Sequence, residues 1–387
     1  MLLIASQSLK TSPVLADLVR EMSFAVSYFA SPGTLATLLK GKTRRLVLIT
    51  ERDISEPVIA SLRAASGQTP LGILVAADRA PLAASDKKAL LNELQELENL
   101  EWVGTEPDFD ALRNSATRCR RRLLKVSRDE VNRAFDNFEF VVRYQPKVER
   151  GEGQEWHTRE AEALVRWKHP EMGLLGPMEF LPEVEAFGMM GRLTEFVIRK
   201  SAAQLAVWHK QGIELTACIN LASSLLNEPA LAHRYAQIVR ELKFTPDCFT
   251  LEVIEQDLSN PEAPHVRTIN ELREEGFRLC LDDFRVAAAS LSTFEKLPFD
   301  EIKIHAAALR RAQKDQTAMA VLAAVTGLAH NLGMSVCAEG VEDRKTFEFL
   351  KTIECDKMQG FLISEAVMPH IIRSVYSTND LEVGDVA

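Results

Sequence analysis

The 387-residue sequence lacks three features, each typical of a distinct class of protein. It has no apolar run long enough to span a bilayer and no basic-then-apolar segment at its start, so we expect a cytoplasmic protein. Its six cysteines stand far apart without a CxxC pair, and we interpret them as small core residues. It also lacks an excess of basic residues, and the net charge of −9 argues against general nucleic-acid binding.

What the sequence does contain is a long alternation of strand-like and helical patterns. The first five strand-like runs are "MLLIAS", "FAVSYFA", "RLVLIT", "LGILVAA" and "LEWVG". Five βα units in a little over a hundred residues predict a doubly wound, flavodoxin-like layout. We place this domain at residues 1–106.

This layout resembles a response-regulator receiver domain. The resemblance implies acidic residues after the first strand, an aspartate ending the third and a lysine after the fifth. Those places hold Ser6 with Gln7, Thr50 and Glu106, and Asp53 lies three residues beyond Thr50. We therefore expect a degenerate, pseudo-receiver domain without a Mg²⁺ site or phosphoryl acceptor, which offers a surface to a protein partner.

Residues 107–137 are helical in pattern and form the predicted connector. A basic cluster lies there, and either a solvated helix face or a contact with acidic partners or lipid headgroups accounts for it. Its members are Arg118, Arg120, Arg121, Arg122 and Lys125. We expect a flexible tail at residues 378–387.

From residue 138 to 377, polar side chains follow successive buried strand-like runs. In order they are Glu162, Asn220, Glu252, Asp282, Asp283, Lys303, Glu339 and Gln359. Taken singly, Asp282 and Asp283 could cap a helix, Glu252 could face water, and Lys303 could be a surface lysine. In a βα barrel, however, the C-terminal strand ends share one face. The sequence therefore predicts a cation site on a barrel.

The ordered motifs of this part resemble the EAL domain. They are "YQPKVE", "EALVRWKHPEMGLLGPMEFLPEVEAFGMM", "CINLASSLL", "LEVIE", "LDDF", "IKI", "CAEGVE" and "MQGF". The resemblance implies a modified TIM (βα) barrel that binds cyclic di-GMP. In active family members it also implies hydrolysis of that ligand to linear pGpG with two Mg²⁺ or Mn²⁺ ions.

The residue types suit that chemistry, because hard cations prefer oxygen ligands and paired cations activate water against a phosphodiester. By resemblance, Glu162, Asn220, Glu252 and Asp282 hold one ion, and Asp282, Asp283 and Glu339 hold the other. Lys303 orients or deprotonates the water. The resemblance also implies that Arg166 pairs with a ligand phosphate and that Gln145 and Pro177 shape the guanine end of the groove. Gln359 forms a hydrogen bond near the second ion, and Glu255 and Glu342 support the site from behind.

The sequence departs from the family after the paired aspartates. The family pattern is DDFGxGYSS, and here "DDFRVAAASL" puts Arg285, Ala287 and Ala288 in place of two glycines and a tyrosine. Alanine and arginine avoid the backbone conformations that glycine adopts. His305 also replaces an aspartate after Lys303, with either a metal-ligand or a hydrogen-bonding role.

Two main hypotheses follow, since the retained Arg166 and Gln359 argue against a third, a protein-interaction module that no longer binds nucleotide. The chain is a cyclic di-GMP phosphodiesterase, slowed by the altered loop, or it is a receptor that binds the nucleotide without turnover and acts through a protein partner. We lean to the enzyme because the whole ligand set is retained. By resemblance a homodimer is expected in either case.

Overall fold

The computed structural model describes residues 2–6, 12, 15, 25–40, 45–50, 53–66, 71–77, 100–105, 109–123, 126–151, 155–254, 264–284, 298–313 and 315–377. Two compact units make up the chain: Met1–Val141 with Arg166–Gly188, and Val142–Val165 with Met189–Ala387. No helix within the described ranges is both long and apolar enough to cross a bilayer.

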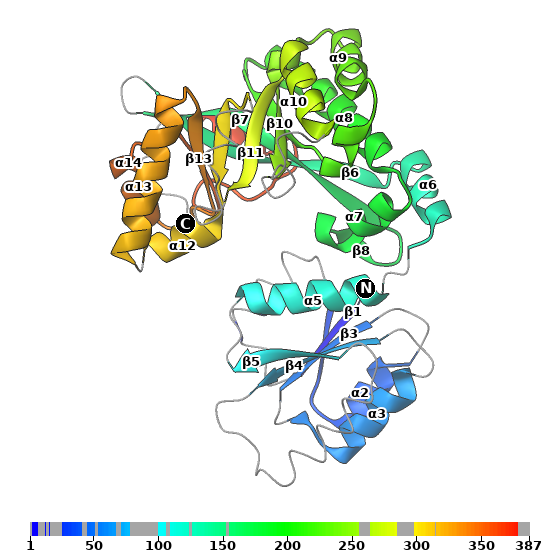
Figure 1. The fold of residues 1–387 in the computed structure, drawn as a ribbon. Coiled ribbons are helices and arrows are strands. Elements are labelled where there is room, and N and C mark those ends of the chain that lie inside the picture. Colours follow the sequence, from blue (N-terminus) through cyan, green and yellow to red (C-terminus); the bar gives the residue numbers. More distant parts are fainter. Residues whose placement is uncertain are drawn as a thin grey trace. The chain divides into compact units, whose positions relative to one another are not determined.

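The N-terminal part is a five-stranded parallel sheet in the order β2-β1-β3-β4-β5 (Figure 1). That order is the one of the flavodoxin-like fold, as the sequence predicts. Its strands are β1 (Leu2–Ser6), β2 (Ala25–Phe29), β3 (Arg45–Thr50), β4 (Leu71–Ala77) and β5 (Leu100–Thr105).

Helices cover both faces of this sheet. They are α2 (Pro32–Leu38), α3 (Glu56–Ser66) and α5 (Phe109–Leu123). Because side chains alternate along a strand, Val47 and Ile49 of β3 belong to one core with α2 and α3, and Leu46 and Leu48 belong to another with α5. The apolar runs of β3 and β4 are thus strands buried on both sides.

The receiver assignment itself stays a prediction. Ser6 ends β1 and Thr50 ends β3. Asp53 turns back on the strand end: its Oδ2 accepts hydrogen bonds from the backbone N–H of Thr50 at 2.9 Å and from its hydroxyl at 2.7 Å. Gln7 and Glu106 lie outside the described residues.

The predicted connector contains two separate helices. The first is α5, which packs on the N-terminal sheet through Leu112, Ala116 and Cys119. The second is α6 (Arg128–Asp136), which begins at a capping box between Ser127 and Glu130. Of the basic cluster, Arg118 pairs with Glu101 at 2.9 Å, and the other side chains lie outside the described residues.

The rest of the chain folds into a closed barrel of eight strands in the order β6-β14-β13-β12-β11-β10-β9-β7, with β6 also paired to β7. A hairpin strand, β8 (Gly173–Leu175), extends β7. The strands β7 and β9 to β14 run parallel, and β14 meets β6 antiparallel. The barrel strands are β6 (Phe140–Arg150), β7 (Trp156–His169), β9 (Thr216–Asn220), β10 (Phe249–Ile254), β11 (Arg278–Phe284), β12 (Glu301–Ile304), β13 (Ser335–Glu339) and β14 (Lys357–Gln359).

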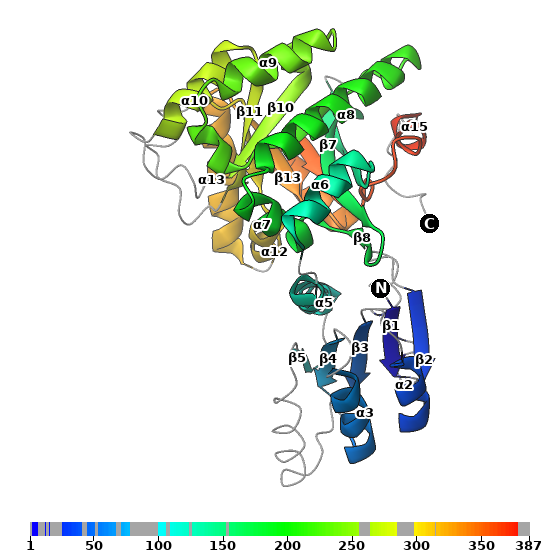
Figure 2. The same ribbon diagram turned by 90° about the vertical axis from the view of Figure 1, so that its right-hand side faces the viewer.

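Helices follow most of these strands and surround them (Figure 2). They are α7 (Pro177–Ala186), α8 (Met190–Lys210), α9 (Leu231–Glu241), α10 (Pro264–Glu274), α12 (Ala306–Ala312), α13 (Gln316–Asn331), α14 (Arg344–Thr352) and α15 (Ile372–Ser377), with short 3₁₀ turns η3 (Ser223–Asn227) and η4 (Pro246–Cys248). This architecture confirms the predicted modified TIM barrel, whose C-terminal strand ends share one face.

Candidate functional site

The barrel interior carries two successive rows of side chains, because every second residue of a strand points inward. The upper row lies at or near the C-terminal ends of the shorter strands, where the sequence predicts a site, and within the longer strands β6 and β7. We name it the mouth row: Gln145, Glu162, Asn220, Glu252, Asp282, Lys303, Glu339 and Gln359. All of these except Gln145 are among the site residues predicted at strand ends, and Gln145 was predicted at the guanine end of the groove.

Lys303 stands at the centre of the mouth row. Its Nζ lies 3.0 Å from Glu162 Oε2, 3.0 Å from Glu252 Oε2 and 2.6 Å from Glu339 Oε1. The side chain of Lys303 is 1% exposed, so these carboxylates replace water around the ammonium group. Three strands, β7, β10 and β13, thus converge on one cation.

Amide groups complete the surroundings of Glu162. Asn220 Nδ2 donates to its Oε1 at 2.7 Å, and Gln359 Nε2 donates to its Oε2 at 2.8 Å. Gln359 Nε2 also donates to Gln145 Oε1 at 3.1 Å. Side chains up to 214 residues apart in the sequence therefore meet at one point of the mouth.

Burial and neighbouring charges shift the pKa values of the side chains in the mouth row. Burial alone raises the pKa of Glu162, but Lys303, Lys147 and the two amide donors lower it to about 2. Burial lowers the pKa of Lys303, but Glu162, Glu252, Glu339 and Asp282 raise it well above its ordinary value. Burial and the adjacent Glu162 carboxylate raise the pKa of Glu252. In this arrangement the Lys303 ammonium group donates hydrogen bonds to Glu162 and Glu252.

These residues fit a divalent cation. Three carboxylates already converge on a positive charge, and Gln359 Oε1 is a buried acceptor that has no hydrogen-bond partner among the described residues. Carboxylate and amide oxygens are the donors that Mg²⁺ and Mn²⁺ prefer. No group of three or more His, Cys, Asp or Glu side chains in the described ranges is arranged around a metal position. Glu162, Glu252 and Glu339 surround the Lys303 ammonium group instead.

The other predicted residues lie elsewhere on the described elements or outside the described part. Arg166 lies on β7 four residues beyond Glu162, Pro177 begins α7, and Glu342 is exposed after β13. His305 caps α12, where its Nδ1 accepts a hydrogen bond from the Ala307 N–H at 3.1 Å. The Asp283 side chain and all of Glu255, Arg285, Ala287 and Ala288 lie outside the described residues.

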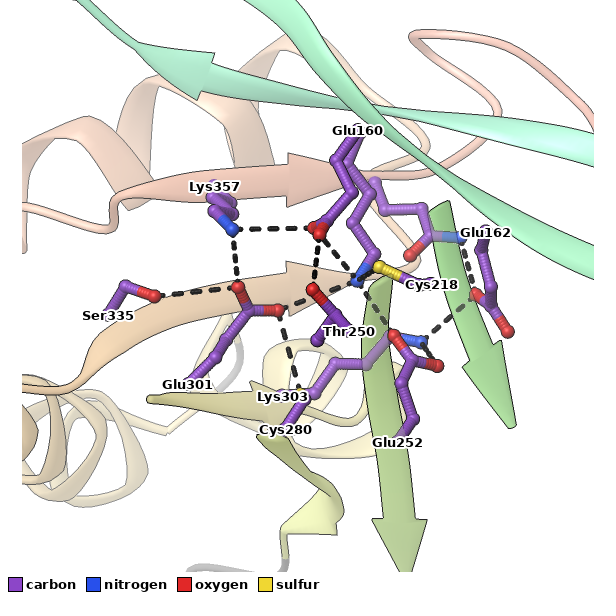
Figure 3. A network of polar contacts seen from close by, with 12 residues as sticks. Glu160, Glu162, Cys218, Thr250, Glu252, Cys280, Glu301, Lys303, Ser335 and Lys357 are labelled. Atoms are coloured by element: carbon purple, nitrogen blue, oxygen red, sulfur yellow. Dashed lines mark hydrogen bonds and ion pairs between the residues drawn. The ribbon is translucent and has the colours of Figure 1, made fainter. Parts of the chain in front are cut away.

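A second group of charges, not predicted from the sequence, lies two residues below the mouth row on four strands (Figure 3). We name it the floor cluster: Lys147, Glu160, Glu301 and Lys357. Cys218, Thr250, Cys280 and Cys337 occupy the same level on the other four strands, and all eight of these residues are buried. The signal for this cluster was available, because each charged member is two positions from a predicted site residue on the same strand.

The floor cluster compensates its own charge. Lys147 and Lys357 each contact both Glu160 and Glu301, with N–O distances of 2.6–3.5 Å, and Arg278 approaches Glu160 at 3.9 Å. Burial raises the pKa of Glu301, but Lys147 and Lys357 lower it below its ordinary value. Two lysines thus face two glutamates on the floor, whereas one lysine faces three glutamates at the mouth.

Known proteins share the barrel. Cyclic di-GMP phosphodiesterase PdeR of Escherichia coli is 31% identical over 236 residues, which are 61% of this chain and 35% of PdeR. Cyclic di-GMP phosphodiesterase RocR of Pseudomonas aeruginosa is 30% identical over 235 residues, 61% of this chain and 59% of RocR. The chain spans about a third of the length of the first curated relatives, 29% to 39%.

Two solved structures are also similar to this chain. The PaMucR phosphodiesterase in complex with c-di-GMP superposes with a TM-score of 0.58 at 27% identity, over 63% of this chain and 98% of PaMucR. An EAL-domain protein from Listeria monocytogenes gives a TM-score of 0.56 at 25% identity, over 65% and 98%. The family model of the EAL domain matches residues 128–366, more than half of the sequence. The chain therefore belongs to the EAL-domain family.

Proposed function

We propose that the barrel binds cyclic di-GMP and hydrolyses it to linear pGpG with two Mg²⁺ or Mn²⁺ ions at the mouth row. The observation that carries the proposal is the convergence of Glu162, Glu252 and Glu339 on one cation position inside an EAL barrel. Relatives named as cyclic di-GMP phosphodiesterases support the reaction class.

In this proposal Glu162, Asn220, Glu252 and Asp282 hold one ion, and Asp282, Asp283 and Glu339 hold the other. Bound cations of this kind neutralise phosphate charge and lower the pKa of a bound water. Lys303 orients or deprotonates the attacking water. Arg166 pairs with a ligand phosphate, and Gln359 fixes the Glu162 carboxylate from the side.

The remaining predicted residues act around the nucleotide or behind the ligands. Gln145 and Pro177 shape the guanine end of the groove, and Glu255 and Glu342 support the rim. A protein partner at the receiver-like domain, a homodimer and a cytoplasmic location stay predictions from the sequence.

The test uses the whole purified chain. It is incubated with cyclic di-GMP and Mn²⁺, and pGpG is quantified by anion-exchange chromatography. We expect product from the native protein and none from Glu162→Gln. Glu348→Gln, on the exposed side of α14, is the matched control and keeps native turnover. Absence of product from the native protein contradicts the enzyme proposal.

The second candidate is a receptor without turnover. The specific observation in its favour is the sequence after Asp283, where Arg285, Ala287 and Ala288 replace the family pattern. Misplacing catalytic groups by about 1 Å can cost on the order of a hundredfold in rate, whereas binding uses more distributed contacts. Calorimetry showing nucleotide binding, together with no pGpG formation, supports this candidate. A sharp gain in turnover for Arg285→Gly at unchanged affinity identifies the loop as the cause.

A further inference from the structure

One glutamate of the mouth row belongs to both charge clusters. Glu252 is fully buried, and its two oxygens face different lysines: Oε2 lies 3.0 Å from Lys303 Nζ, and Oε1 lies 2.7 Å from Lys147 Nζ. Lys147 has no exposed side-chain surface. The Glu252 carboxylate is therefore held by Lys147 from the floor side, and its other oxygen contacts Lys303 of the mouth row.

The floor cluster fixes the position of Lys147 in turn. Its Nζ lies 3.5 Å from Glu160, 3.4 Å from Glu301 and 3.0 Å from Cys218 Sγ. Lys357 holds the same two glutamates from the other side, at 3.3 Å and 2.6 Å. Thr250 and Ser335 add hydrogen bonds to Glu160 and Glu301. Each side chain of the floor cluster contacts two side chains of opposite charge, so Lys147 has little freedom to move.

We propose that Lys147 is a positioning residue that sets the affinity of the mouth row for divalent cations by fixing the Glu252 carboxylate from the barrel floor. This inference rests on the proposed function, since it assigns Glu252 to a metal ion. Partners behind a ligand orient it, and their loss typically costs about 10–100-fold in metal affinity.

Lys357 provides a matched control within the same cluster. It is buried, it is a lysine, and it contacts Glu160 and Glu301 as Lys147 does. Among the described residues, Lys357 forms ion pairs with neither Glu162 nor Glu252. Any loss of Mn²⁺ affinity that results from removing a floor charge in general is therefore expected for both lysine substitutions. A loss that results from releasing the Glu252 carboxylate is expected for Lys147 only.

The experiment measures Mn²⁺ binding to the whole chain without nucleotide, by electron paramagnetic resonance of the free ion. Lys147→Met is expected to weaken binding about 10–100-fold. Lys357→Met is expected to stay within about threefold of the native protein, because the Glu252 contacts remain. Thermal melting of each variant reports the loss of stability that both share.

A charge-compensated pair of variants keeps the test decisive if Lys147→Met does not fold. Glu301→Gln alone leaves Lys147 on Glu252, and Lys147→Met with Glu301→Gln removes one charge of each sign. The double variant is expected to bind Mn²⁺ about 10–100-fold more weakly than Glu301→Gln. If Lys147→Met binds Mn²⁺ as tightly as the native chain, or the double variant as tightly as Glu301→Gln, the role of Lys147 is overturned and the proposed function stands. If the native chain does not bind Mn²⁺, the proposed function and this inference are both overturned.

Discussion

Lys303 is the residue on which the mouth row depends. Removing an ammonium group from water is costly, and only close, well-oriented opposite charges compensate for it. Glu162, Glu252 and Glu339 provide them at 2.6–3.0 Å. A lysine that looks like a surface residue in the sequence is thus the centre of a buried network.

Replacing Lys303 by methionine is expected to affect rate and stability separately. Loss of a side chain that orients or deprotonates the attacking water typically lowers a rate by about 10²–10⁴-fold. Leaving three carboxylates without their shared partner is expected to lower the free energy of unfolding by about 3–5 kcal/mol. Turnover and urea denaturation measure the two effects, and Lys351→Met on the exposed side of α14 is the control. Native turnover in Lys303→Met contradicts a direct role of this residue.

The lowered pKa of Glu162 predicts that the free energy of unfolding depends on pH in the acid range. Its pKa is lowered from an ordinary 4.5 to about 2, so its charged form stabilises the folded barrel above pH 4.5. This contribution is lost as the pH falls from about 4.5 through about 2. In Glu162→Gln the free energy of unfolding is expected to fall less between pH 5 and pH 3 than in the native protein, measured by urea titration. Equal slopes in both proteins rule out this contribution, and Glu348→Gln is expected to keep the native slope.

At the scale of elements, strand periodicity explains which side chains meet. Glu160 with Glu162, Glu301 with Lys303, and Lys357 with Gln359 are pairs two residues apart on β7, β12 and β14. Each pair contributes one side chain to the floor and one to the mouth. The two rows are therefore built by the same strands.

Sequence reasoning found the mouth row because its residues follow apolar runs at strand ends. It missed the floor cluster because a charge inside a strand ordinarily marks the solvent side. Counting two residues back from Glu162 or Lys303 would have exposed the conflict, since an inward charge needs an inward partner. The partners come from β6 and β14, which are far apart in sequence, and only barrel closure brings them together.

The turn after β14 depends on a close approach at Gly360. The Val341 N–H donates to the Gln359 carbonyl at 3.1 Å, and the Leu362 N–H donates to the Val341 carbonyl at 3.0 Å. A Cβ on Gly360 would collide with the backbone of Val341. This contact holds the end of β14, and hence Gln359, against the segment that follows Glu339.

Gly360→Ala is therefore expected to lower the free energy of unfolding by about 1–3 kcal/mol, as overpacking does. Gly327→Ala is the control: Gly327 lies inside α13 with no atom within 4 Å of an added Cβ. It is expected to stabilise the protein by about 0.5–1 kcal/mol, because alanine favours a helix over glycine. Urea denaturation measures both, and equal effects of the two substitutions contradict the close contact.

At the scale of the whole molecule, the free cysteines report on two separate cores. Cys119 belongs to the core between the N-terminal sheet and α5, whereas Cys218, Cys280 and Cys337 line the barrel floor. Burial raises the pKa of all three floor thiols, so they are protonated and unreactive in the folded protein.

Alkylation in increasing urea, read by mass spectrometry, is expected to label Cys248 first, because the other five cysteines are buried. The three floor thiols are expected to become reactive together, at the urea concentration that opens the barrel. Cys119 is expected to follow the unfolding of the N-terminal sheet. Rapid labelling of Cys218 in the absence of urea contradicts the buried floor.

The two parts of the chain differ in how much their sequences reveal. In the barrel, polar residues follow strand-like runs in a set order, and this order predicts both the fold and the candidate site. The N-terminal part has only alternating apolar runs, which predict its strand order but no role. Ser6 and Thr50 at the ends of β1 and β3 carry no charge from which a function could be argued. The arrangement of side chains within its cores could not be derived from periodicity, because packing depends on register between strands.

The position of β14 has a consequence for synthesis on the ribosome. Lys357 and Gln359 are translated after all other members of the floor cluster and the mouth row, and they contact Glu160 and Glu162 of β7. A nascent chain that lacks this strand carries acidic groups that cannot be buried without their counterions. Neither cluster is complete before β14 has been translated, so a product that terminates before this strand lacks the complete floor and mouth.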